Sequence, residues 1–136
     1  MAGDRAREQG LAARPGRGRL AEALAAARLE ALGLRILVRN WRITGREGGE
    51  LDIVADDGGT CVFVEVRSRT GETRGHALEA ITAHKRAHVI RAARLYLTTE
   101  CPVASGYRFD VVAVTFWPDD REPELTYVRD AFGVGR

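Results

Sequence analysis

The pattern of hydrophobic and polar residues near the middle of the chain contains two runs of strand-forming residues, and these predict a β-hairpin. The stretches are residues 50–55 and 60–67, and the turn cluster DDGG at 56–59 lies between them. An even-numbered loop would pair Ala55 with Thr60. Because the side chains of a strand alternate in direction, this register predicts one apolar and one acidic face. The apolar face is expected to carry Leu51, Ile53, Val62, Val64 and Val66, and the acidic face Glu50, Asp52, Phe63, Glu65 and Arg67.

The acidic face brings two carboxylates together. In this register Asp52 is opposite Phe63 and Glu50 is opposite Glu65, so Asp52 and Glu65 are diagonal neighbours. Like charges this close repel each other unless a metal, a proton or an arginine lies between them. We interpret Asp52 and Glu65 as a metal-binding pair, and their hard oxygen atoms favour Mg²⁺ or Mn²⁺.

The segment before the hairpin predicts a helix followed by a strand. Residues 17–32 are rich in strong helix formers, and Gly33 stands where a C-terminal cap belongs. Residues 34–41 predict a strand next to the hairpin, with Ile36 and Val38 on one face and Leu37 on the other. Glu22 shares a stripe of the helix with Ala26 and Leu29. It either interacts with the helix dipole, the more common case, or points along the packed side.

Lys85, the single lysine of the chain, interrupts the apolar stripe of a second predicted helix at residues 76–97. The stripe consists of Leu78, Ile81, Val89, Ala92 and Tyr96. The lysine either extends along the stripe to water, or its ammonium meets a carboxylate cluster under the helix. His84 and His88 have the i, i+4 spacing of zinc helices, but no third ligand accompanies them. We expect them to be solvated or to face a nucleic acid.

The remaining pattern completes an α/β domain. Residues 107–117 predict a long strand, and residues 125–132 predict a short edge strand. The long strand should place Phe109, Val111 and Ala113 on one face and Asp110, Val112 and Val114 on the other. The order helix, strand, hairpin, helix, strand predicts a central mixed sheet flanked by helices. Residues 1–15 lack a sustained apolar period and should form a basic, disordered arm before a single domain at residues 16–136.

Charge is strongly segregated along the chain, although the net charge is only +2. Residues 1–48 and 67–94 each carry +5, whereas residues 49–66 carry −5. An acidic hairpin framed by basic segments suits a cation held against a polyanion. The candidate nucleic-acid contacts are Arg42, Arg46, Arg69 and Arg74, with solvated loop charges as the alternative.

Cysteine usage and hydropathy bear on the compartment. Cys61 and Cys101 have no metal-like spacing and no signal peptide accompanies them, so we expect free thiols in the cytoplasm. No apolar run approaches the roughly 20 residues of a membrane span. We therefore expect a soluble protein without a membrane partner.

Several of these segments together resemble the YraN-like family of bacterial proteins, uncharacterised protein family 0102. They are Gly49–Asp52 (GELD), Phe63–Arg69 (FVEVRSR), the helix with Lys85, and Phe109–Val112 (FDVV). The family is similar to the archaeal Holliday-junction resolvases of the PD-(D/E)XK nuclease superfamily. The resemblance extends over residues 16–132 and implies a restriction-endonuclease-like core.

The resemblance also implies roles for individual residues. Asp52 and Glu65 would ligate Mg²⁺ or Mn²⁺, and Glu22 would join the site. Arg67 stands where the superfamily has a lysine. A guanidinium can hold a phosphate but does not lose a proton near neutral pH, so Arg67 is excluded as a general base. The metal, Glu22 or Lys85 would then have to activate the water.

The expected function is a metal-dependent endonuclease that hydrolyses phosphodiesters with metal-activated water. The expected partner is nucleic acid, DNA in particular, and the resolvase likeness leaves room for branched DNA and a homodimer. The alternative is an inactive nucleic-acid-binding module on the same fold. A third interpretation treats Glu50, Asp52, Glu65 and Arg67 as a structural ion-pair cluster.

Overall fold

The structure is a computed structural model that describes residues 10–45, 49–71 and 81–135. Its elements are α1 (Gly10–Ala31), β1 (Arg35–Ile43), β2 (Gly49–Asp57), β3 (Thr60–Thr70), α2 (Ala83–Glu100), β4 (Gly106–Phe116) and β5 (Glu124–Phe132). The strands form one sheet in the order β1-β2-β3-β4-β5. Among the strands in the described residues only β3 and β4 pair in parallel, so the sheet is mixed. The predicted α/β class, element order and edge strand are confirmed.

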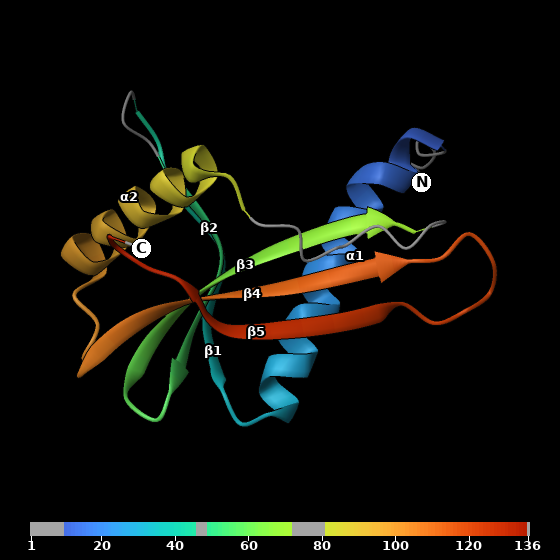
Figure 1. The fold of residues 1–136 in the computed structure, drawn as a ribbon. Coiled ribbons are helices and arrows are strands. Elements are labelled where there is room, and N and C mark those ends of the chain that lie inside the picture. Colours follow the sequence, from blue (N-terminus) through green and yellow to red (C-terminus); the bar gives the residue numbers. More distant parts are fainter. Residues whose placement is uncertain (1–9, 46–48, 72–80, 136) are drawn as a thin grey trace, which may run out of the picture.

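The two helices cover opposite faces of the sheet, and α1 crosses behind β3, β4 and β5 in Figure 1. Under α1, Leu29 packs with alternate side chains of the central strands, such as Val62 and Val112. Under α2, Val89 and Tyr96 pack on the other set, which includes Phe63 and Phe109. No helix in the described part of the chain is long and apolar enough to cross a membrane.

Helix α1 begins earlier than the sequence predicted. Residues 10–15, which were expected to belong to a disordered arm, are helical. The run LAAR at 11–14 consists of strong helix formers, and the helix continues through Pro15 although an interior proline removes one backbone donor and crowds the carbonyl four residues before it. The helix ends as predicted, because Gly33 has a φ of 100° and follows the last turn. Residues 1–9 lie outside the described residues.

Helix α2 has a defined start at Thr82. The Thr82 side chain accepts a 3.1 Å hydrogen bond from the backbone N–H of Lys85, which caps the helix before Ala83. Residues 81 and 82 are therefore not helical, although the sequence predicted a helix from residue 76 onwards. Residues 72–80 lie outside the described residues. At the other end the helix continues to Glu100, three residues beyond the predicted end at residue 97.

The hairpin of β2 and β3 has a two-residue turn, Gly58-Gly59, and this changes the predicted register. Both glycines have positive φ, 60° and 103°, as type I′ turns require. The observed pairs are Asp57 with Thr60, Asp56 with Cys61, Ala55 with Val62, Val54 with Phe63 and Ile53 with Val64. The shift from the prediction is two residues, so most side chains keep their predicted face. One step beyond the last pair, Asp52 is level with Glu65 and no longer diagonal to it.

A bulge in β1 moves one side chain to the other face. The register of β1 against β2 shifts between Ile36 and Val38. As a result Ile36 packs under α1, whereas Leu37 and Val38 both pack under α2. The prediction that Val38 shares a face with Ile36 is wrong, because a bulge interrupts the period of two.

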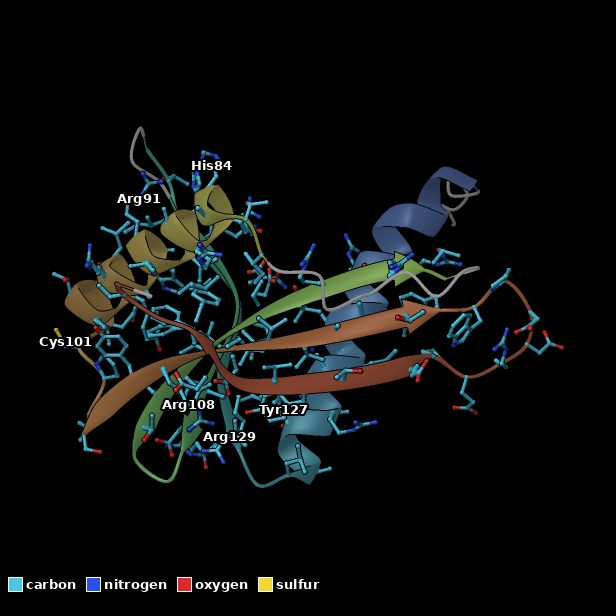
Figure 2. The ribbon with its side chains drawn as sticks, viewed as in Figure 1. His84, Arg91, Cys101, Arg108, Tyr127 and Arg129 are labelled. Carbon is cyan, nitrogen blue, oxygen red and sulfur yellow. The ribbon has the colours of Figure 1, made fainter. Side chains whose placement is uncertain are left out.

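A buried ion pair fixes β4 to β5 and to the hairpin turn. Asp110 is fully buried, and its carboxylate accepts hydrogen bonds from Arg108 Nε at 3.0 Å and from the Tyr127 hydroxyl. Arg108 also donates a 2.8 Å hydrogen bond to Asp57. Figure 2 shows Arg108, Tyr127 and Arg129 close together, far from His84 on α2. This cluster is structural, because its charges are fully paired within the fold.

Candidate active site at a fork in the sheet

Strands β2 and β3 separate from each other at Asp52 and Glu65. Their ladder ends at the pair Ile53 and Val64. Beyond this pair β2 remains hydrogen-bonded to β1 as far as Gly49, and β3 remains hydrogen-bonded to β4 as far as Thr70. The sheet therefore contains a fork, defined here as the opening between residues 49–52 of β2 and 65–70 of β3. Asp52 and Glu65 lie at its closed end.

The backbone of β2 changes phase at Asp52. Leu51 packs in the core under α2, whereas Ile53 packs in the core under α1, although the two residues are two positions apart. The prediction that both lie on one apolar face is wrong. Between them the Asp52 carboxylate accepts a 2.8 Å hydrogen bond from the backbone N–H of Val66. The Asp52 side chain thus bridges the two strands where the ladder ends.

Asn40 of β1 stands opposite this change of phase. The register of β1 against β2 places Asn40 level with Asp52, and Asn40 has a φ of 55°. A left-handed residue inside a strand costs roughly 1–3 kcal/mol, and asparagine tolerates the conformation better than most residues. Asn40 is not among the site residues that the sequence predicted. The sequence does carry a signal for it, because strands are depleted in asparagine and Asn40 lies inside a predicted strand.

Glu22 of α1 approaches the fork from one face of the sheet. Its side chain is 12% exposed and accepts a 2.7 Å hydrogen bond from Asn40 Nδ2. Arg39 lies 3.7 Å from the same carboxylate. Because α1 begins at Gly10, Glu22 is about three turns from the helix start, and the helix-dipole interpretation is wrong. Glu22 and Asp52 line a common hollow of about 670 Å³.

Lys85 of α2 approaches the fork from the opposite face. Its ammonium lies 3.3 Å from Glu65 Oε2, so the predicted contact with a carboxylate is present. The Glu65 side chain is 10% exposed, but that of Lys85 is 54% exposed. The lysine therefore combines the two interpretations: its stem reaches along the helix edge, and its charge meets the carboxylate. Arg67, two residues after Glu65 on β3, is half-buried.

The two carboxyl groups at the fork bind protons more tightly than usual. Burial, followed by the negative charge of Asp52, raises the pKa of Glu65 to about 7, although Lys85 opposes this shift. Burial also raises the pKa of Asp52, against the lowering effect of the Val66 N–H. The two groups are close enough for a hydrogen bond between them. Two ionised carboxylates here would repel each other, and a cation between them would relieve this repulsion.

A hard divalent ion fits this donor set. Within residues 10–45, 49–71 and 81–135, no three His, Cys, Asp or Glu side chains converge as a complete metal cage. Mg²⁺ usually needs only one or two carboxylates, because water and substrate phosphates supply its other ligands. Asp52 and Glu65 provide such a pair, whereas Glu22 is hydrogen-bonded to Asn40 beside it.

The four predicted nucleic-acid contacts have different outcomes. Arg42 lies at the open end of the fork, with its guanidinium 3.3 Å from Glu50. Arg69 lies on β3, two residues after Arg67, and is half-buried. Arg46 and Arg74 lie outside the described residues. The structure therefore brings Arg42 to the candidate site and leaves the other three as predictions.

Comparisons with known proteins identify the family. The model of the Uncharacterised protein family UPF0102 matches residues 21–114, a range that contains every candidate residue from Glu22 to Lys85. A UPF0102 protein of Acidothermus cellulolyticus is 43% identical over 130 residues, which cover 88% of this chain and 96% of the relative. UPF0102 proteins of Pseudomonas aeruginosa strain LESB58 and of Pelotomaculum thermopropionicum are 47% and 44% identical over 117 residues. Those matches cover 85% of this chain and 91% and 93% of the relatives. The chain therefore belongs to the uncharacterised protein family UPF0102.

Proposed function

We propose that this chain is a metal-dependent nuclease that hydrolyses phosphodiester bonds in nucleic acid. One observation carries the proposal. Asp52 and Glu65 are brought together at the closed end of the fork, where burial disfavours the ionised form of both groups and the charge of Asp52 further disfavours that of Glu65. An ion pair built only for stability would not need a second carboxylate at this point.

Asp52 and Glu65 would hold Mg²⁺ or Mn²⁺. When bound, such an ion stabilises negative charge on a phosphate and makes its coordinated water more acidic. Lys85, beside Glu65, would orient a phosphate oxygen with its ammonium. Glu22, which lines the same hollow as Asp52, is the carboxylate placed to accept a proton from a water there. Arg67 would hold the phosphate without exchanging a proton.

The distribution of charge supports nucleic acid as the substrate. Residues 49–66, which include Asp52 and Glu65, carry −5 and lie in the sequence between segments that each carry +5, and Arg42 stands at the open end of the fork. A polyanion would be attracted to these basic segments, and the bound cation would neutralise the carboxylates of Asp52 and Glu65. DNA in the cytoplasm is the expected substrate, consistent with the free thiols of Cys61 and Cys101. A homodimer would present two such sites to a branched substrate.

A second candidate function is nucleic-acid binding without cleavage. Arg67 favours this candidate, because the superfamily that the family resembles has a lysine at that position. Without turnover, binding should depend on salt and be indifferent to EDTA. In a purely structural ion-pair cluster, by contrast, the fork would bind no metal.

Two measurements test the proposal. Purified protein is incubated with branched, single-stranded and duplex DNA in Mg²⁺ or Mn²⁺, and Mn²⁺ binding is measured by calorimetry. We expect cleavage that Asp52→Asn and Glu65→Gln abolish together with Mn²⁺ binding. Asp56→Asn is the matched control, because Asp56 lies on the same strand at the hairpin end and pairs with Arg35. Absence of cleavage and of Mn²⁺ binding in the parent protein would refute the proposal.

A further inference from the structure

A second hollow adjoins the fork on the side of α2. Its volume is about 620 Å³, and it lies between the first turns of α2 and the ends of β1 and β2. The charged and imidazole side chains that line it are Arg42, Glu50, His84, Lys85 and His88, and Thr44 adds a hydroxyl. We call it the histidine hollow. Figure 2 shows His84 at the first turn of α2, beside the end of β2, and its side chain is exposed.

The chemistry of the histidine hollow suits an anion. Arg42 and Lys85 contribute two positive charges, and each is paired with one carboxylate, Arg42 with Glu50 in the hollow and Lys85 with Glu65 at the fork. The His84 and His88 rings lie edge to face, with 4.6 Å between their centroids, and each ring carries at least one N–H donor. A metal is a poorer fit, because the two histidines have no third ligand in the described residues. Phosphate oxygens match a set of several donors and two cations.

The histidine hollow is continuous with the candidate active site. Lys85 lines it and also contacts Glu65 at 3.3 Å. Arg42 and Glu50 line both the histidine hollow and the hollow of Glu22 and Asp52. A chain of phosphates that passed the carboxylate pair would therefore continue over Arg42 towards the histidines. A single phosphate could not occupy both hollows.

We infer that the histidine hollow is a second phosphate subsite, which binds a backbone phosphate next to the scissile one. The inference rests on the proposed function and deepens it, because it states that the substrate is a polynucleotide strand and not a mononucleotide. His84 and His88 donate hydrogen bonds to the phosphate, and Arg42 supplies its charge at the junction of the two hollows.

Binding in EDTA tests the subsite independently of cleavage. Fluorescence anisotropy with labelled single-stranded and duplex DNA measures the affinity of the full chain and its dependence on salt. We expect His84→Ala/His88→Ala and Arg42→Ala each to weaken binding at least about fivefold, and Arg42→Ala to lower the salt slope by about one. His84→Gln/His88→Gln, which keeps side-chain donors, should recover part of the affinity.

Arg35→Ala is the matched control. Arg35 lies on β1 like Arg42, is likewise exposed, and pairs with a carboxylate of β2, but it stands at the opposite end of the strand. Its removal changes the net charge by the same amount and should leave the affinity within twofold. Equal losses in Arg35→Ala and Arg42→Ala, or parental affinity in the histidine double variant, would overturn the inference.

The outcome separates the subsite from the proposed function. Loss of binding in the histidine variant of a protein that never cleaves would support phosphate binding in the histidine hollow and refute the nuclease. Cleavage with unchanged binding in that variant would support the nuclease and refute the subsite.

Discussion

The side-chain amide of Asn40 donates a 2.7 Å hydrogen bond to Glu22 Oε1, and this contact joins β1 to α1 beside the fork. Asn40 holds a left-handed backbone there, with a φ of 55°. Asn40 thus has two roles: its backbone accommodates the change of phase in β2, and its side chain orients the carboxylate of Glu22. Asn40 is therefore a positioning residue, since it acts on the site through Glu22.

Substitution of Asn40 separates these two features. Asn40→Gly accepts the left-handed backbone but lacks the amide, so we expect stability within about 1 kcal/mol of the parent and slower cleavage. Asn40→Ala should lose the same activity and roughly a further 1 kcal/mol of stability. Urea unfolding and single-turnover cleavage measure the two effects. Cleavage by Asn40→Gly at the parental rate would show that Glu22 needs no such support.

The raised pKa of Glu65 makes the stability of the metal-free protein depend on pH. Burial and the charge of Asp52 raise this pKa from 4.5 to about 7, so the folded state binds the proton more tightly than the unfolded state. Stability from this group is fully present below pH 4.5 and is lost as the pH rises through 7. We expect a loss of about 1–3 kcal/mol between pH 5 and pH 8, measured by urea unfolding in EDTA.

Glu65→Gln is the control for this pH dependence. Glutamine has nearly the same shape and never ionises, so the variant should be more stable than the parent at pH 8 and should lose most of the slope. Saturating Mn²⁺ should stabilise the parent and leave the variant unchanged. A parental slope in Glu65→Gln would assign the pH dependence to another group.

Lys85 should matter for catalysis far more than for stability. Its side chain is half-exposed, and such an ion pair contributes about 1 kcal/mol or less. We therefore predict that Lys85→Ala abolishes cleavage with a thermal midpoint close to that of the parent, and that Arg67→Lys retains or raises activity. A gel assay of cleavage and thermal unfolding provide the readouts. Undiminished cleavage by Lys85→Ala would remove the lysine from the proposed mechanism.

The close approach of α2 to β2 predicts a structural effect at Gly49. A Cβ atom at Gly49 would lie 2.9 Å from Cβ of Ala92, so Gly49→Ala must push α2 away from the fork. We expect a loss of about 1–3 kcal/mol and weaker cleavage, because Lys85 moves with the helix. Gly18→Ala is the contrasting variant, since a Cβ there meets no atom within 4 Å. It should stabilise α1 by about 0.5–1 kcal/mol in the same unfolding assay.

Local patterns predicted most of the fold correctly. The order of elements, the hairpin, the Gly33 cap and the faces of β4 all follow from propensity and from the period of two. The register error at the hairpin came from the choice of turn. Two successive glycines accept positive φ at both central positions of a turn, so the turn forms at Gly58-Gly59. The predicted pairing of Ala55 with Thr60 required a turn centred one residue earlier.

The fork itself could not be read from local patterns. It exists because β2 continues with β1 while β3 continues with β4, and the pairing of β3 with β4 joins strands that are far apart in the sequence. The change of face between Leu51 and Ile53 has the same origin. Likewise, the start of α1 at Gly10 decided the environment of Glu22, and nothing near Glu22 itself marks that start.

The parallel pairing of β3 with β4 has a consequence for the order of folding. Parallel neighbours need a long crossover, and here the crossover contains α2 and therefore Lys85. Pairing of β1 with the hairpin is local in sequence and should form early, whereas closure of the crossover is entropically slower. Before this closure, Asp52 and Glu65 would lack their lysine. Closure of the crossover brings the ammonium to the carboxylates, so the complete charge arrangement arises only as the sheet closes.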